Sequence, residues 1–379
     1  MKKLIVGGNF GDARESSIVN KLSDLLVTHK VNGGSLDDLQ NALNLVPDYD
    51  FIIWMPNINN EVAKDYPKKK KGSILICSKV INDERTIADA VTRIFKMNAN
   101  AVITIHLSKY GFAFKLIDAL GNLWVDTSDL NDLVQAILKL IEWTKNSIRK
   151  NTKLLNLKEQ MHHWFHTKKP NRDVVDWLDS VSDQEKLKFL NQDLKPEQKF
   201  CDIVKIVAQK IEKERGGRYF GNASTRCSFT FPSKKLDDGI LVSGRNMPKD
   251  FIKPEDFVYA YEGNNEILYT DSNLKPSVDT PVQIELYKRF PSMRYIIHGH
   301  AYIEGAWMTK QYYPCGDLRE VDAVFEIIGP WLEDIELELG LFCINLKNHG
   351  FLIFGEDLDD LEEFIGVTRF IHRELEEKI

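Results

Sequence analysis

The first 148 residues alternate between short apolar runs and helix-like segments, and this alternation restricts the possible fold more than any other feature of the sequence. The apolar runs that we interpret as strands are residues 3–6, 50–55, 73–77, 101–106 and 112–117. The spacing of apolar residues from Leu130 to Trp143 is that of an amphipathic helix. Continuous apolar strands that alternate with helices are typical of a parallel sheet covered on both faces. We therefore predict a doubly wound, Rossmann-like or flavodoxin-like α/β domain at residues 1–148.

A glycine-rich turn, Gly7-Gly-Asn-Phe-Gly11, follows the first predicted strand and precedes a helix-like segment from Ser16 to Val27. A phosphate group can bind at such a strand-to-helix turn. The turn matches neither the GxGxxG pattern of dinucleotide-binding domains nor the GxxxxGK[ST] pattern of a P-loop. We interpret it as a tight turn and keep nucleotide or nucleotide-sugar binding as an alternative function of this domain, whose ligand stays unknown.

A polar, helix-like stretch follows, and we predict that residues 149–195 form a helical connector. A second domain is predicted at residues 196–379. It begins with a helix from Glu197 to Glu214, continues as a β-rich region with Pro and Gly turns, and ends in a helix from Leu358 to Glu377. A chain of 379 residues is long for a single core, which agrees with two domains.

The composition is that of an ordinary globular protein, with 43% hydrophobic and 28% charged residues. A net charge of −6 provides no general attraction to nucleic acid, and no apolar stretch is long enough to span a membrane, so neither partner is expected. The five cysteines are scattered and lack CxxC spacing, which favours a reducing compartment over a disulfide framework. The N-terminal apolar run is too short for a signal-peptide core. We therefore expect a cytoplasmic protein.

His298-Gly299-His300 directly follows an apolar run, Met293 to Ile297, that is predicted to be a strand. Alternation along the strand places positions 298 and 300 on the same face. Two imidazoles on one face can bind one metal ion, and catalytic zinc sites use three protein ligands with one position open. Taken alone, the pair also fits two surface histidines at a strand end.

Four further motifs accompany this pair along the chain. They are Gly221-Asn-Ala-Ser-Thr-Arg226, Val242-Ser-Gly244, Lys275-Pro-Ser-Val-Asp-Thr-Pro281 and Asn348-His-Gly350. Taken in order, the five motifs resemble those of the class II aldolase/adducin family, which includes L-fuculose-phosphate aldolase and L-ribulose-5-phosphate 4-epimerase. The resemblance covers residues 196–379, about half of the chain. It implies an α/β domain with a central, mainly antiparallel sheet.

The resemblance implies that His298, His300 and His349 bind a divalent metal ion. Zinc is the default for three imidazoles, and manganese, cobalt or iron stay open. The resemblance further implies an enzyme of carbohydrate metabolism, an aldehyde-lyase or an epimerase, that acts on a small sugar or sugar-phosphate through a metal-stabilised enediolate. It also implies a homotetramer. A non-catalytic, adducin-like binding module is the alternative.

Asp279 stands where the aldolase branch of the family has a catalytic glutamate and the epimerase branch has an aspartate close to the metal. We predict that Asp279 is a metal ligand or the general acid/base. The other interpretation is structural, because an aspartate before Thr280-Pro281 can cap the helix that starts there. A carboxylate has two oxygens, so both roles are compatible.

The resemblance assigns the anionic end of the substrate to Asn222, Ser243, Gly244 and Ser277. The family's second serine in the PSS segment is replaced by Val278, so one hydroxyl donor is missing. The charges of Arg226, Arg245 or Lys275 can compensate, since the planar guanidinium fork of arginine suits phosphate.

The stretch between His300 and His349 is 49 positions, shorter than expected in the aldolase and epimerase branches. The catalytic aspartate of the epimerase lies in this stretch and cannot be assigned here. We predict that Tyr313 is a second proton-transfer residue, because the family uses a tyrosine donor, often from the neighbouring subunit. Tyr312 and Asp317 are alternatives. Packing is the other interpretation of both tyrosines, and capping of a helix near Leu318 is the other interpretation of Asp317.

Overall fold

The computed structural model describes residues 4–8, 13–26, 29–32, 37, 41, 44, 51–55, 73–81, 86–109, 111–154, 195–212, 214–231, 234–263, 265–269, 273–332 and 340–372. Most of the predicted connector, residues 155–194, lies outside the described residues. The chain divides into two compact units. Unit 1 contains Met1–Asn146, Arg215–Arg218 and Glu374–Ile379, and unit 2 contains Ser147–Glu214 and Tyr219–Arg373.

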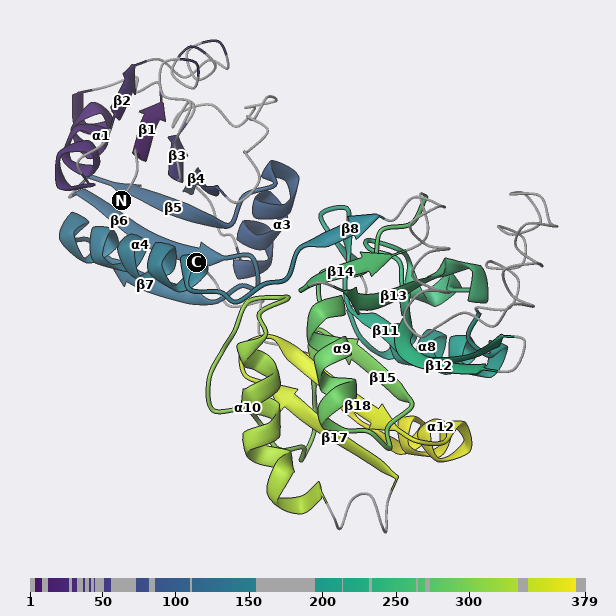
Figure 1. Cartoon of the computed structure of the whole chain (residues 1–379). Helices are drawn as coiled ribbons and strands as arrows, with labels where there is room; N and C mark the ends of the chain where they lie inside the picture. The colour runs from purple at the N-terminus through teal and green to yellow at the C-terminus, as the bar shows by residue number, and fades with distance from the viewer. Residues whose placement is uncertain are drawn as a thin grey trace. The chain divides into compact units, whose positions relative to one another are not determined.

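Unit 1 is built on a seven-stranded sheet with the order β2-β1-β3-β4-β5-β6-β7 (Figure 1). The strands are β1 Leu4–Gly8, β2 His29–Asn32, β3 Phe51–Met55, β4 Ile74–Ile81, β5 Ala101–Ser108, β6 Gly111–Asp118 and β7 Leu123–Thr127. Each neighbouring pair among strands β1 to β5 is parallel. Strands β6 and β7 are antiparallel, because short turns rather than helices connect β5 to β6 and β6 to β7.

Helices cover both faces of this sheet. They are α1 Ala13–Leu26, α3 Ile87–Met97 and α4 Leu130–Lys145. Helices α1 and α4 pack against one face, where Ile53 and Ile103 are fully buried, and α3 packs against the other face (Figure 1). Helix α4 begins where the amphipathic pattern predicted, and Asp129 caps its first turn by accepting a hydrogen bond from the Asn131 amide.

Unit 2 contains an eight-stranded sheet with the order β17-β18-β15-β11-β12-β13-β14-β8. The strands are β8 Thr152–Leu154, β11 Asn222–Phe231, β12 Lys234–Ser243, β13 Phe257–Gly263, β14 Glu266–Tyr269, β15 Tyr295–Gly299, β17 Leu341–Leu346 and β18 Gly350–Gly355. Every pair is antiparallel except β14 and β8. Among the described residues, two small pairs stand apart from the two large sheets, namely β9 Glu214–Arg215 with β10 Arg218–Tyr219, and β16 Ala301–Ile303 with β19 Phe370–His372.

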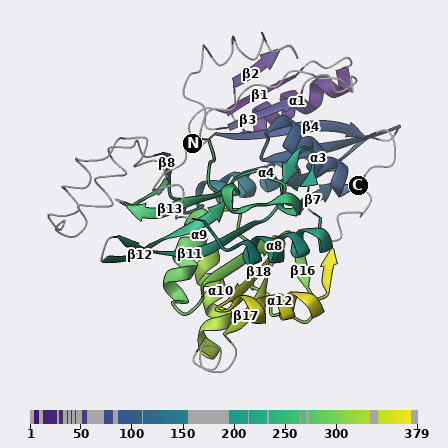
Figure 2. The ribbon, with the colours of Figure 1, turned by 90° about the vertical axis from the view of Figure 1, so that its right-hand side faces the viewer.

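Two layers of helices cover the unit 2 sheet. They are α8 Gln198–Lys210, α9 Thr280–Arg289, α10 Arg319–Ile328 and α12 Leu358–Val367, with the short 3₁₀ helices η1 Lys249–Phe251, η2 Pro254–Asp256 and η3 Gly329–Trp331. Helices α8 and α12 pack on one face and helices α9 and α10 on the other (Figures 1 and 2). No helix in the described part of the chain is long and apolar enough to cross a membrane.

The prediction of one continuous helix from Leu358 to Glu377 is wrong. Helix α12 ends at Val367, and its last turn is closed by a hydrogen bond from the Thr368 amide to the Phe364 carbonyl. Residues 370–372 then form strand β19, which pairs with β16. The helix does not continue to Glu377, because residues 370–372 pair with a strand that is distant in the sequence. The periodicity of one segment does not reveal such pairing.

Candidate metal centre

Three histidines meet where strands β15 and β18 lie side by side. His298 is in β15, His300 follows that strand, and His349 is in the turn between β17 and β18. One nitrogen atom from each ring lies within 4.8 Å of those of the other two. The structure therefore brings together the three residues that the motifs predicted as metal ligands.

Glycine makes this close approach possible. Gly299 and Phe351 are partners in the β15–β18 ladder, and a Cβ atom on Gly350 would overlap the Gly299 carbonyl oxygen. Asn348, at φ 56°, provides the left-handed residue of the turn before His349. The glycines of the His-Gly-His and Asn-His-Gly motifs thus allow the two backbone segments to touch.

His298 is held as a neutral imidazole. Its Nδ1 atom lies 2.9 Å from the Phe351 carbonyl oxygen, which can only accept, so Nδ1 carries the proton and Nε2 has the lone pair. Burial, followed by the charge of His349, lowers the pKa of His298 to about 4. Nε2 is buried and has no hydrogen-bond partner among the described residues. A lone pair that is desolvated and unpartnered fits a metal ion.

His349 is oriented by an acid that the sequence analysis did not single out. Its Nδ1 lies 2.8 Å from Glu320 Oε1, and both side chains are buried. Burial lowers the pKa of His349, but the Glu320 carboxylate and the Cys315 sulfur outweigh burial and hold it well above its ordinary value. The Nε2 atom lies 3.3 Å from Cys315 Sγ. A carboxylate on the far nitrogen is the usual outer partner of a metal-binding imidazole.

Asp279 is placed against the histidines by strand β11. Asn222 is the ladder partner of His298, and its amide group donates to Asp279 Oδ2 at 2.9 Å. Gln283 Nε2 donates in turn to Asn222 Oδ1. The other carboxylate oxygen of Asp279 is buried and, in the part of the chain that the structure describes, has no hydrogen-bond partner. The Asp279 side chain makes no capping hydrogen bond to helix α9, so the capping interpretation receives no support.

Lys249 is a second residue that sequence reasoning missed. It lies in η1 and is only 6% exposed. Burial lowers its pKa to about 8, and the nearby Asp279 carboxylate opposes this shift. The sequence Met247-Pro-Lys-Asp-Phe251 has the composition of a solvated loop, so nothing local indicated burial.

The side chains predicted to hold an anion are buried and partly engaged. The Ser243 hydroxyl accepts from the Ala223 amide at 3.1 Å, and the Ser277 hydroxyl accepts from the Asp279 amide at 3.4 Å. The Gly244 amide already donates to the Asp256 carbonyl. Both hydroxyl hydrogens stay available, whereas the Gly244 N–H is used by the fold.

Arg226 serves the fold instead of compensating for the missing serine. Its guanidinium group donates to the carbonyl oxygens of Met293, Tyr287 and Phe290. These acceptors lie at and just beyond the carboxyl end of α9, where cationic groups stabilise a helix. Arg245 donates to the Pro276 carbonyl, and Lys275 is exposed. The buried cation beside the acid is therefore Lys249.

A family model described as Class II Aldolase and Adducin N-terminal domain matches residues 201–368. That segment belongs to this family. No match was found among curated proteins. Similar solved structures include an aldolase II superfamily protein from Pseudomonas syringae (14% identity, covering 50% of this chain and 77% of that chain, TM-score 0.31). L-fuculose-1-phosphate aldolase from Thermus thermophilus is another (16% identity, 44% and 90% covered, TM-score 0.26). A third is the N-terminal class II aldolase domain of a conserved protein from Thermoplasma acidophilum (12% identity, 44% and 86% covered, TM-score 0.29).

The shortened stretch of this class II aldolase domain forms a turn beside His349. Asp317 is fully buried, pairs with the Arg319 guanidinium group and accepts from the Arg319 amide at the start of α10. This is the structural role that was considered for Asp317. The Tyr313 hydroxyl donates to Gln311 Oε1 at 2.8 Å, and the Arg319 guanidinium group lies 5.1 Å from the Tyr313 ring centre. A proton-transfer role for Tyr313 stays a prediction.

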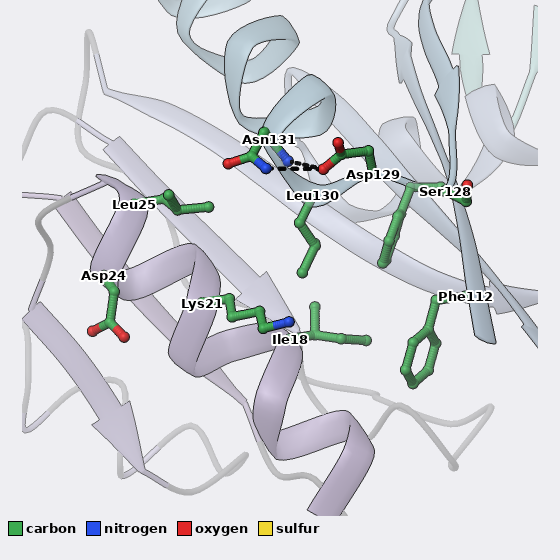
Figure 3. A pocket seen from close by; sticks show the side chains of 10 residues that line it. Ile18, Lys21, Asp24, Leu25, Phe112, Ser128, Asp129, Leu130 and Asn131 are labelled. Atoms are coloured by element: carbon green, nitrogen blue, oxygen red, sulfur yellow. Dashed lines mark hydrogen bonds between the residues drawn. The ribbon is translucent and has the colours of Figure 1, made fainter.

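A separate hollow of about 720 Å³ lies in unit 1, outside the class II aldolase domain (Figure 3). Ile18 and Lys21 of α1 face Phe112 of β6 and the first turn of α4 across it. Of its two acidic residues, Asp24 and Asp129, the second is already bonded to the backbone and side chain of Asn131. The hollow contains no cluster of groups comparable with the histidines of unit 2, so we do not assign it as the reactive site.

Proposed function

We propose that the class II aldolase domain is a metal-dependent lyase that acts on a small sugar or sugar-phosphate through an enediolate. Epimerisation is the alternative outcome of the same chemistry. The observation that carries the proposal is the convergence of three imidazoles beside a buried carboxylate with one unpartnered oxygen. Cleavage next to a carbonyl needs both an electrophile and a proton carrier, and these groups fit the two tasks.

His298, His300 and His349 would hold the divalent cation, for which we propose zinc. When bound, the ion would act as a Lewis acid on the oxygen atoms of the substrate. His298 fits this role because its buried Nε2 has no other partner. His349 fits because Glu320 fixes the ring through Nδ1 and leaves Nε2 toward the centre of the cluster.

Asp279 would carry the proton. Asn222 holds one carboxylate oxygen, and the second oxygen is free to accept a proton from the substrate or to return it. Direct ligation of the ion by the same oxygen is the other role that the structure permits. Tyr313 is proposed as a further donor by its position in the family pattern alone.

The charge of Lys249 supports a substrate with an anionic group. Burial of an ammonium group is costly, and an anionic group bound beside it would offset this cost. Ser243, Ser277 and the second amide hydrogen of Asn222 could donate to the same anion. We propose that Lys249 binds the anionic group of the substrate in place of the serine hydroxyl that is missing at Val278.

The rival is a non-catalytic, adducin-like binding module. Metal analysis of the purified full-length protein and a screen of free and phosphorylated ketoses, aldehyde pairs and sugar acids test the two against each other. An enzyme should contain about one divalent ion per chain, and His298→Ala should lose both the ion and the activity. A protein without stoichiometric metal, or one whose turnover is unchanged by His298→Ala, would refute the enzyme.

The family pattern also motivates the proposal of a homotetramer in solution. Light scattering coupled to size-exclusion chromatography measures this directly. A monomer over a range of concentrations would remove the neighbouring subunit as a source of the tyrosine donor.

For unit 1 we propose a doubly wound domain that binds a nucleotide or nucleotide-sugar. The order β2-β1-β3 reverses direction at β1, and ligands of such sheets bind outside the carboxyl ends of the strands at this reversal. Thermal shifts of the full chain with a panel of nucleotides test the idea. The absence of any shift at millimolar nucleotide would contradict it.

A further inference from the structure

Two departures from the family pattern meet in space beside the histidines. One is Val278, which stands in place of a serine, and the other is the shortened stretch that contains Gly316. A Cβ atom on Gly316 would lie 2.8 Å from the Val278 carbonyl oxygen and 3.2 Å from Val278 Cγ1. Gly316 also has φ +77°, which a side chain disfavours. The shortened stretch therefore packs directly on the residue that replaces the serine.

This packing places Cys315 next to His349. The Cys315 sulfur lies 3.3 Å from His349 Nε2. A sulfur at about 2.3 Å and a nitrogen at about 2.05 Å from one tetrahedral zinc ion are separated by roughly 3.5 Å. The observed separation is thus compatible with two atoms that share one ion.

The surroundings of the sulfur point to a metal independently of the cysteine. His298 is 4% exposed, its Nε2 has no partner, and its ring centre lies 4.8 Å from that of His349. Glu320 holds His349 through Nδ1, so that Nε2 is the atom presented to Cys315. The thiol accordingly lies against an imidazole nitrogen that the fold has oriented for binding.

We propose that Cys315 is a fourth ligand of the ion bound by His298, His300 and His349 in the substrate-free protein, at the position that an oxygen atom of the substrate would otherwise occupy. The proposal rests on the metal centre of the proposed function. One metal–sulfur bond forms in addition to three metal–nitrogen bonds, and the proton shared by Cys315 Sγ and His349 Nε2 is released to solvent. A thiolate ligand selects zinc or cobalt over manganese and magnesium. This ligand set gives the metal centre a preference that three imidazoles alone leave open.

Cobalt substitution tests the ligand without any substrate. The full-length protein loaded with Co²⁺ should show a thiolate-to-metal charge-transfer band in the near ultraviolet together with tetrahedral ligand-field bands. In Cys315→Ser the charge-transfer band should disappear, while the ligand-field bands persist because three imidazoles still hold the ion. Cys343→Ser is the matched control, since Cys343 is also partly exposed but lies in β17. This control should keep the band.

Metal affinity and thiol protection are two further measurements, and thiol protection stays informative if Cys315→Ser folds poorly because it uses the unmodified protein. Zinc competition should show binding weakened in Cys315→Ser by at least roughly the 10- to 100-fold that loss of an outer-shell partner causes, with a smaller change for manganese. In the unmodified protein, zinc should protect Cys315 from iodoacetamide, and a chelator should remove this protection. Alkylation of Cys343, read by peptide mass, is the internal reference.

The outcomes separate this proposal from the proposed function. A protein that binds cobalt stoichiometrically but lacks the charge-transfer band, or an unchanged band in Cys315→Ser, would overturn the ligand role of Cys315 and leave the three-histidine enzyme intact. Failure to bind any divalent metal would overturn both.

Discussion

Asp118 of unit 1 and Asp279 of unit 2 are both buried carboxylates, but their oxygens are used differently. Asp118 accepts from the backbone amides of Leu120 and Asn122, from the Asn122 side chain and from Trp124 Nε1. Both oxygens of Asp118 are therefore engaged in closing the turn between β6 and β7. Asp279 uses one oxygen for Asn222 and leaves the other unpartnered.

The difference distinguishes a carboxylate that stabilises the fold from one that is available for a reaction or a ligand. A buried acid whose oxygens are all satisfied stabilises a fold, because each hydrogen bond replaces one to water. A buried acid with an unsatisfied oxygen costs stability and is retained where it performs a reaction or binds a ligand. Unit 2 places further buried ionisable groups near Asp279, including Lys249 and His298.

The most severe test exchanges each acid for its amide. Asp279→Asn keeps an oxygen for Asn222 and removes the proton carrier, so the rate with the substrate found in the screen should fall by about 10²- to 10⁴-fold, with stability changed by less than about 1 kcal/mol. Asp118→Asn places an amide against the Trp124 N–H donor and should cost about 2 kcal/mol of stability without affecting the rate. Thermal unfolding and initial rates measure both effects. If Asp279→Asn is destabilised but keeps normal turnover, Asp279 has a structural role and not a catalytic one.

Lys249→Met should stabilise the protein at neutral pH. The pKa of Lys249 is about 8 in the folded chain, against 10.5 for the free side chain, so the charged form costs about 3 kcal/mol at pH 7. Below pH 8 both states are charged and the full penalty applies. Between pH 8 and 10.5 the folded chain gives up the proton first, and the advantage of the variant should shrink. Thermal unfolding across this range measures the difference.

Lys253→Met is the control for that experiment, because Lys253 is exposed in the adjacent η2 segment. It should change stability little at any pH. If Lys249→Met proves less stable than the parent at pH 7, the ammonium group has a stabilising partner and, like the Asp118 carboxylate, serves the fold.

Glu320→Ala tests whether the Glu320 carboxylate of α10 supports metal binding or only the fold. Because Glu320 orients His349, its removal should weaken zinc binding by about 10- to 100-fold, as outer-shell losses typically do. Glu326→Ala, on the same helix but exposed and paired with Lys310, should leave affinity unchanged. Competition with a chelating dye measures both variants. Equal affinities would assign Glu320 a purely architectural role.

The smallest effect concerns the turn that carries Cys315. Gly316 and Gly305 have φ of +77° and +78°, but only Gly316 lies against another residue. Both alanine variants pay the same backbone strain, and Gly316→Ala adds the contact with Val278, which should cost about 1 kcal/mol more. Thermal unfolding of the pair measures this excess. Identical melting temperatures would show that the turn does not press on Val278.

Motifs predicted the part of the site in which residue type and order suffice. The three histidines and Asp279 were found because they follow strands or precede a helix at fixed positions in the chain. The alternation of apolar runs likewise predicted the parallel strands of unit 1, but not the reversal at β6, since an apolar run has no direction.

The supporting residues could not be found in the same way. Glu320 looks like an ordinary acid in the first turn of an amphipathic helix, and its partner lies 29 residues away. Lys249 gains its significance only from burial. Arg226 was one of three residues considered for anion binding, and its position in strand β11 directs the guanidinium group to the end of α9. Such roles arise from tertiary contacts that local patterns do not contain.

Strand β11 has a consequence for engineering. Asn222 at its start holds the amino end of α9 through Asp279, and Arg226, four residues later, holds the carboxyl end. The same strand is in ladder contact with His298. One strand therefore fixes the spacing between the acid and the histidines. A directed-evolution library aimed at new substrates should keep residues 222–226 constant and vary residues 273–278 and 309–314, so that substrate specificity can change while the spacing between the acid and the histidines is kept.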